Sequence, residues 1–145
     1  MEDATGYPFV GPAGKLLDEW LEKAKIPSDL TAFTNAVVCA PRTDPESFIG
    51  SPSDAMIAEC EPRLLSFVQL AQPTYIVFVG KHAKKTRKPI NDLYKSLSWS
   101  PPITAEIQHP AFMLRRPRNE LLLTKRIHET LRDLSHQFHH QTPTP

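Results

Sequence analysis

The chain has 145 residues and a net charge of +1, which argues against a disulfide-dependent mini-protein and against a globally basic nucleic-acid binder. We expect residues 1–138 to form one domain and residues 139–145 to form a disordered tail. No apolar run approaches the roughly 20 residues that span a bilayer, and the acidic N-terminus is unlike a signal peptide. We therefore expect a cytoplasmic protein with no membrane partner.

The near-neutral total hides a division of charge along the chain. Residues up to Gln72 include 5 basic and 11 acidic side chains, a net charge of −6, whereas the residues from Pro73 onward include 12 basic and 5 acidic ones, a net charge of +7. A polyanion would be attracted to the second half and repelled by the first. We therefore expect a polyanionic partner to face the C-terminal half.

Two cysteines, Cys39 and Cys60, are too few for a secreted disulfide scaffold. The number of cysteines is compatible with two buried thiols, with two metal ligands or with a single disulfide bridge. The sequence leaves these alternatives open at this point.

The first half of the chain predicts helices on either side of a strand. Apolar residues recur at three- and four-residue steps over 12–25, which is typical of an amphipathic helix. Residues 31–39 are β-prone and mostly apolar, so they predict a buried strand whose one polar side chain is Asn35. A proline-rich loop over 40–52 precedes a second helix that Ser53 caps and that continues to about residue 71.

The second half continues the alternation of strands and helices. Residues 74–80 form an apolar run that ends in glycine, which predicts a parallel strand followed by a tight turn. Five cations within residues 81–88 indicate either a basic helix start or a solvated loop. A short helix is expected over 90–97, a strand over 103–109 and a long helix over about 118–138.

This alternation predicts the α/β class, with an open, mainly parallel sheet and helices on both faces. Such sheets bind ligands at the carboxyl ends of their strands. Asn35 to Cys39 lie near the end of one predicted strand, the basic segment 81–88 follows another and His109 ends a third. A buried asparagine also needs a hydrogen-bond partner or a ligand. The sequence therefore predicts a functional site that combines an amide, cations and a histidine.

Four segments occur in an order and spacing that resemble a known family. They are G-Y-P-F-V-G-P-A-G-K-L-L at Gly6–Leu17, T-N-A-V-V-C-A-P at Thr34–Pro41, C-E-P-R-L at Cys60–Leu64 and H-P-A-F-M-L-R-R-P at His109–Pro117. Together they resemble the uracil-DNA glycosylase superfamily, most closely its iron-sulfur type, family 4. The resemblance implies a three-layer α/β/α sandwich with a mainly parallel central sheet. It also implies hydrolysis of the N-glycosidic bond of uracil flipped out of DNA, in base excision repair.

The resemblance implies roles for four side chains at the base. Phe9 would stack on the flipped uracil, and the Asn35 amide would donate to one uracil carbonyl while accepting from the ring N–H, a pattern that cytosine does not match. His109 would donate to uracil O2, where negative charge develops as the bond breaks. Glu2 matches the end of the loop that carries the family's active-site acid.

The resemblance also implies how the DNA is held. Arg115 and Arg116 fall on a loop that approaches the DNA backbone in the family, and Lys84 and Lys85 belong to the cationic segment that would extend this footprint. The expected partner is DNA that contains uracil, the expected oligomeric state is a monomer, and an active enzyme would associate with the nucleoid.

Cys39 and Cys60 fall where the family has the second pair of the four thiolates that hold its 4Fe-4S cluster. The family's C-x-x-C pair, its first strand and its G-E-x-P-G loop would precede Met1. With two cysteines we expect a chain free of the cluster, and without the acidic loop we expect weak uracil binding and a large fall in turnover. Three interpretations stay open: a truncated enzyme, a non-catalytic glycosylase-fold module that binds DNA or protein, and an enzyme that compensates by other means.

Overall fold

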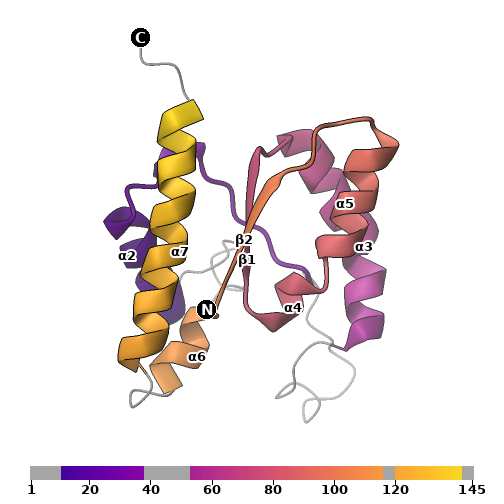
Figure 1. The fold of residues 1–145 in the computed structure, drawn as a ribbon. Helices are drawn as coiled ribbons and strands as arrows, with labels where there is room; N and C mark the ends of the chain where they lie inside the picture. Colours follow the sequence, from indigo (N-terminus) through magenta and orange to yellow (C-terminus); the bar gives the residue numbers. More distant parts are fainter. Residues whose placement is uncertain (1–10, 38–52, 116–119, 142–145) are drawn as a thin grey trace. The chain divides into compact units, whose positions relative to one another are not determined.

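The computed structural model describes residues 11–37, 53–115 and 120–141 of the chain (Figure 1). The chain divides into two compact units. Unit 1 consists of Met1–Phe33 and Ala105–Pro145, and unit 2 consists of Thr34–Thr104.

Unit 1 is built from helices around one apolar core. Its elements are α2 (Pro12–Lys23), the short 3-10 helix η1 (Ser28–Leu30), α6 (Pro110–Arg115) and α7 (Glu120–Gln141). Helix α2 packs against both α6 and α7, as Figure 1 shows. The buried side chains of these helices are Leu17, Trp20, Pro110, Met113, Ile127, Leu131 and Leu134. Burial of each large apolar side chain contributes roughly 1.5–3 kcal/mol.

Helix α2 confirms the amphipathic pattern predicted from the sequence. It begins with Pro12 at its first turn, where the missing N–H costs no helical hydrogen bond. It ends as Lys25 takes a left-handed conformation with φ of 59°, and the Ile26 amide donates to the Leu21 carbonyl at 3.0 Å. The predicted range 12–25 therefore includes this C-terminal cap.

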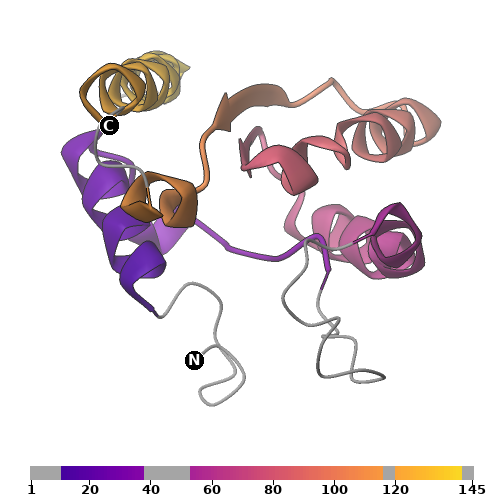
Figure 2. The ribbon, with the colours of Figure 1, turned by 90° about the horizontal axis from the view of Figure 1, so that it is seen from below.

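Unit 2 surrounds a short strand with three helices. Its elements are α3 (Asp54–Ala71), β1 (Tyr75–Val79), α4 (Lys81–Lys84) and α5 (Arg87–Ser96). Helices α3 and α5 lie side by side in Figures 1 and 2, and α4 packs on β1. The buried core of the unit contains Leu64, Val68, Phe78, Ile90 and Tyr94. These elements confirm the predicted second helix and the predicted strand before Gly80, and they show that the basic segment 81–88 is helical at both its ends.

Capping contacts set the ends of the unit 2 elements. The Met56 amide donates to the Ser53 hydroxyl oxygen at 3.2 Å, which confirms Ser53 as the N-cap of α3. A tertiary contact holds α5 in place: the Tyr94 hydroxyl donates to the Pro73 carbonyl oxygen at 2.6 Å, and the Tyr94 ring packs edge-to-face against Trp99. Burial raises the pKa of Tyr94. The hydrogen bond ties α5 to the residues that lead into β1.

Strands β1 and β2 (Ile103–Ile107) pair in parallel as a two-stranded sheet. The pairing begins where the Ile103 amide donates to the Thr74 carbonyl oxygen at 2.8 Å. Helices joined to parallel strands confirm the predicted α/β class. Strand β2 ends at Ile107, so His109 lies just beyond the strand rather than at its last residue.

None of the described helices is long and apolar enough to cross a bilayer.

The predicted strand over 31–39 is wrong for the part of it that the structure describes. Residues 31–37 contain no helix or strand, and residues 38 and 39 lie outside the described residues. Within the described residues the sheet consists of β1 and β2, and residues 31–37 pair with neither strand. High β-propensity produces a strand only where a neighbouring strand supplies hydrogen bonds.

The C-terminal elements differ from the prediction in two ways. Residues 110–115, where no helix or strand was predicted, form helix α6, because a proline at the first helical position is compatible with a helix start. Helix α7 continues to Gln141, three residues past its predicted end at 138. The last residues of the predicted tail, 142–145, lie outside the described residues.

Gly80 offers a direct test of the turn between β1 and α4. Its φ of 89° and ψ of 171° lie in a region that only glycine occupies without strain. We expect Gly80→Ala to lower the free energy of unfolding by about 1–3 kcal/mol in urea titrations. Ser98→Gly is the matched control because Ser98 has a left-handed φ of 56°. That change should leave stability unaltered or raise it by up to about 1 kcal/mol. Equal stability of Gly80→Ala and the wild type would contradict this account.

Candidate functional site

His109 caps the first turn of α6. Its carbonyl oxygen accepts from the Phe112 amide at 3.0 Å, and its ring nitrogen Nδ1 accepts from the Ala111 amide at 3.0 Å. Pro110 follows as the first helical residue and is fully buried, which anchors the turn in the core of unit 1. The His-Pro pair therefore begins a helix and holds the imidazole in place.

The contact with Ala111 also decides which ring nitrogen carries the proton. A backbone N–H can only donate, so Nδ1 must be the unprotonated acceptor nitrogen of a neutral ring. The proton of neutral His109 is therefore on Nε2. An N–H held in a fixed direction can stabilise negative charge on a neighbouring group without a net positive charge on the ring.

Asn35 lies in the irregular segment of unit 2, half-buried, and not in a strand as predicted. Arg63 of α3 holds this segment: its Nη2 donates to the Asn35 carbonyl oxygen at 2.8 Å and to the Thr34 hydroxyl oxygen at 2.9 Å. Among the residues that the structure describes, none hydrogen-bonds the Asn35 side-chain amide. A side-chain amide that no described residue engages can donate to a ligand carbonyl and accept from a ligand N–H.

Lys85, in the basic segment of unit 2, forms an ion pair with Asp54 of α3. Lys85 Nζ lies 2.7 Å from Asp54 Oδ1, and this hydrogen bond lowers the pKa of the Asp54 carboxyl. His82 is close to the same pair, and burial, together with Lys81 and Lys85, lowers the pKa of its imidazole. The segment therefore presents less positive charge than its sequence indicates.

The second ion pair joins Lys88 Nζ to Asp92 Oδ2 at 2.9 Å along α5. Between the two pairs, the Arg87 guanidinium lies over the Phe78 ring, 5.3 Å from its centroid. Lys84 is half-buried on α4. The DNA-binding roles of Lys84 and Lys85 stay predictions.

Arg115 is exposed at the C-terminal end of α6, where the prediction placed a loop. A cation at this end of a helix interacts favourably with the backbone carbonyls. Three other predicted site residues, Glu2, Phe9 and Arg116, lie outside the described residues. His109 and Arg115 belong to unit 1, and Asn35 and the basic segment belong to unit 2.

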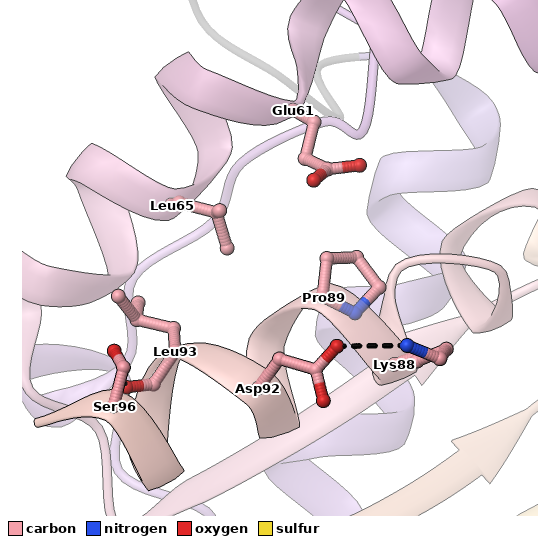
Figure 3. Close-up of a pocket in the computed structure, with 7 residues that line it drawn as sticks. All are labelled: Glu61, Leu65, Lys88, Pro89, Asp92, Leu93 and Ser96. Atoms are coloured by element: carbon pink, nitrogen blue, oxygen red, sulfur yellow. Dashed lines mark hydrogen bonds and ion pairs between the residues drawn. The ribbon is translucent and has the colours of Figure 1, made fainter.

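A groove between α3 and α5 is the pocket that Figure 3 shows. The Leu65 and Leu93 side chains lie on its two sides, and the Lys88–Asp92 ion pair lies at its edge. The full lining is Glu61, Leu65, Lys88, Pro89, Asp92, Leu93 and Ser96. The lining includes none of the predicted site residues, so this groove is separate from the candidate site.

The cysteines do not by themselves fit a four-thiolate cluster site. Cys60 is a half-buried free thiol on α3, and Cys39 lies outside the described residues. Within the described ranges, no three or more His, Cys, Asp or Glu side chains are grouped to hold a metal ion. A 4Fe-4S cluster is held by about four thiolates, and the chain contains two cysteines.

Comparison with known proteins identifies the family. The family model described as "Uracil DNA glycosylase superfamily" matches residues 1–135. The chain belongs to this superfamily. The match covers nearly all of the chain and includes every segment on which the resemblance was based.

Three similar proteins, each named "Type-4 uracil-DNA glycosylase", are also found. The protein of Archaeoglobus fulgidus is 28% identical over 130 residues, which is 81% of this chain and 63% of that protein. That of Sulfurisphaera tokodaii is 34% identical over 58% of this chain and 36% of its own length. That of Thermotoga maritima is 37% identical over 57% of this chain and 40% of its own length. The matched regions therefore span between about a third and two thirds of these relatives.

Arg63 was not assigned a role from the sequence, although it lies in the motif C-E-P-R-L. Periodicity places Arg63 on the exposed side of α3, but it does not show which distant backbone the guanidinium reaches. The contact to Asn35 joins residues 28 positions apart. Only the path of the segment around Asn35 reveals it.

The capping role of His109 can be separated from its Nε2–H. His109→Ala removes the side-chain acceptor for the Ala111 amide and should lower the free energy of unfolding by about 1 kcal/mol in urea titrations. Asparagine is a strong N-cap residue, so His109→Asn should retain most of that stability. Nitrogen-15 NMR of the wild-type ring should show the Nε2–H tautomer at neutral pH. A dominant Nδ1–H tautomer would contradict the hydrogen bond to Ala111.

Proposed function

We propose that the chain is a DNA glycosylase that hydrolyses the N-glycosidic bond of uracil flipped out of DNA. The observation that carries this proposal is the fixed tautomer of His109, whose Nδ1 accepts the Ala111 amide at 3.0 Å. Membership of the uracil DNA glycosylase superfamily supports it. The partner is uracil-containing DNA, and the protein acts as a monomer in the cytoplasm, at the nucleoid.

The chemistry of His109 follows from the bond that breaks. As the bond between the sugar and uracil N1 lengthens, the electron pair moves onto the base and negative charge accumulates on O2. The Nε2–H of His109 donates to O2 and stabilises this charge. Because the ring is neutral, it retains its proton and the departing base leaves as an anion. Water then adds to the cationic sugar carbon and loses a proton to the solvent, and the uracil anion takes up a proton from the solvent, which completes the hydrolysis.

Asn35 supplies selectivity for the base. Its amide N–H donates to a uracil carbonyl, and its amide oxygen accepts from the uracil ring N–H. Cytosine presents an amino group and an unprotonated ring nitrogen at these positions, so both contacts fail. A site built for one hydrogen-bond pattern rejects the other strongly, because its polar groups are left without partners.

The remaining predicted residues have supporting roles in this proposal. Phe9 stacks on the flipped base, and Glu2 is the acid beside it. Arg115, Arg116, Lys84 and Lys85 contact DNA phosphates. Because Cys39 and Cys60 supply two of about four thiolates, the proposed reaction involves no step at a cluster.

Release of free uracil from a single-stranded oligonucleotide tests the proposal. Loss of one hydrogen-bond donor to a developing anion lowers kcat by about 10²–10³-fold, so we expect that effect for His109→Asn, which keeps the cap. His136→Asn on the exposed side of α7 is the matched control and should act like the wild type.

Asn35→Ala should lower kcat/KM for uracil by about tenfold or more, because the side-chain amide that hydrogen-bonds the base is lost. It should also reduce the ratio of uracil to cytosine excision. The absence of product from the wild-type chain at micromolar concentration would overturn the catalytic proposal. Salt-sensitive binding that is equal for uracil- and thymine-containing strands would then identify a non-catalytic DNA-binding module.

A further inference from the structure

Arg63 reaches from α3 to the backbone that carries Asn35. One nitrogen, Nη2, donates to the Asn35 carbonyl oxygen at 2.8 Å and to the Thr34 hydroxyl oxygen at 2.9 Å. A guanidinium Nη atom bears two hydrogens, so it can serve both acceptors at once. The positive charge strengthens each hydrogen bond relative to one between neutral groups.

The segment around Asn35 depends on this kind of support. Apart from the Thr31 amide, which donates to the Ser28 carbonyl oxygen at the end of η1, residues 31–37 belong to no helix or strand, so regular secondary structure does not fix their dihedral angles. The contact to the Asn35 carbonyl restrains the peptide plane directly after its Cα, and the contact to Thr34 restrains the residue before it. The direction in which the Asn35 side chain leaves the backbone is therefore set from both sides.

We propose that Arg63 is a positioning residue that orients Asn35 and so determines the selectivity for uracil. This inference rests on the proposed function, since it assigns Arg63 to the same base-reading residue. Arg63 acts through the backbone of Asn35 and contacts no substrate. The planar, branched donor group matters, because a lysine ammonium on a flexible stem reproduces the charge but not the fixed geometry.

Arg63 is itself exposed, so direct contact with a DNA phosphate is the competing role. The two roles differ in their dependence on salt. A lost phosphate contact reduces the slope of log K against log salt concentration by about one. A lost positioning contact leaves that slope unchanged and alters the excision of uracil relative to cytosine.

The experiment compares Arg63→Met, Arg63→Lys and Thr34→Val with the wild type, and uses Arg132→Met on the exposed face of α7 as the matched control. For each protein, uracil and cytosine excision, the salt slope of DNA binding and hydrogen exchange of residues 31–37 are measured. We expect Arg63→Met to lower kcat/KM for uracil by about tenfold or more, to reduce the uracil preference and to speed exchange in 31–37.

Thr34→Val removes one of the two acceptors, so it should change the same quantities in the same direction by less. Arg63→Lys should retain part of the exchange protection that Arg63→Met loses. A variant that combines Arg63→Met with Thr34→Val should resemble Arg63→Met alone, and Arg132→Met should match the wild type. If Arg63→Met fails to fold, the Thr34→Val variant tests the positioning role of Arg63 instead, because it removes one of the two acceptors of Arg63.

Each outcome separates the inference from the proposed function. An active wild type with unchanged selectivity and exchange in Arg63→Met overturns the role of Arg63 alone. A reduced salt slope with unchanged exchange identifies a phosphate contact instead. A wild type that releases no uracil overturns the proposed function and, with it, the assignment of Arg63.

Discussion

The hydrogen bond from the Ala111 amide to His109 Nδ1 is the constraint on which the proposed chemistry depends. It satisfies one of the amides that the start of α6 leaves without a helical partner, and it places the proton of the neutral ring on Nε2. Pro110 makes this arrangement durable, because it begins the helix and lies fully buried in the core of unit 1. In the proposed reaction, fold stability and the position of the catalytic proton therefore depend on the same contact.

Hydrogen bonds from Arg63 hold the segment that contains Asn35. The structure gives its segment no ladder, and the guanidinium of Arg63 replaces the missing backbone hydrogen bonds with two contacts from one side chain. A charged donor can do this from a helix without forming a strand. Under the proposed function, base selectivity would therefore depend on a surface arginine of α3, whereas the charge-stabilising group would depend on a helix cap.

Much of the fold follows from the sequence where the pattern is local. The apolar spacing in α2, the Ser53 cap and the glycine after β1 predict those elements because each depends on residues within a few positions. Residues 31–37 do not form the strand that their sequence predicts, because a strand needs a neighbouring strand and local propensity does not supply one. The motif residues predict His109 and Asn35 as site residues, but the ring tautomer and the contact of Arg63 depend on tertiary geometry.

Titration of free uracil into nitrogen-15-labelled protein tests the central claim most directly, since it reports on the recognising groups without requiring turnover. The account predicts that uracil shifts the side-chain amide signals of Asn35 and the Nε2–H signal of His109, and that cytosine at the same concentration does not. Equal responses to uracil and cytosine, or no response of either residue to uracil, would contradict it.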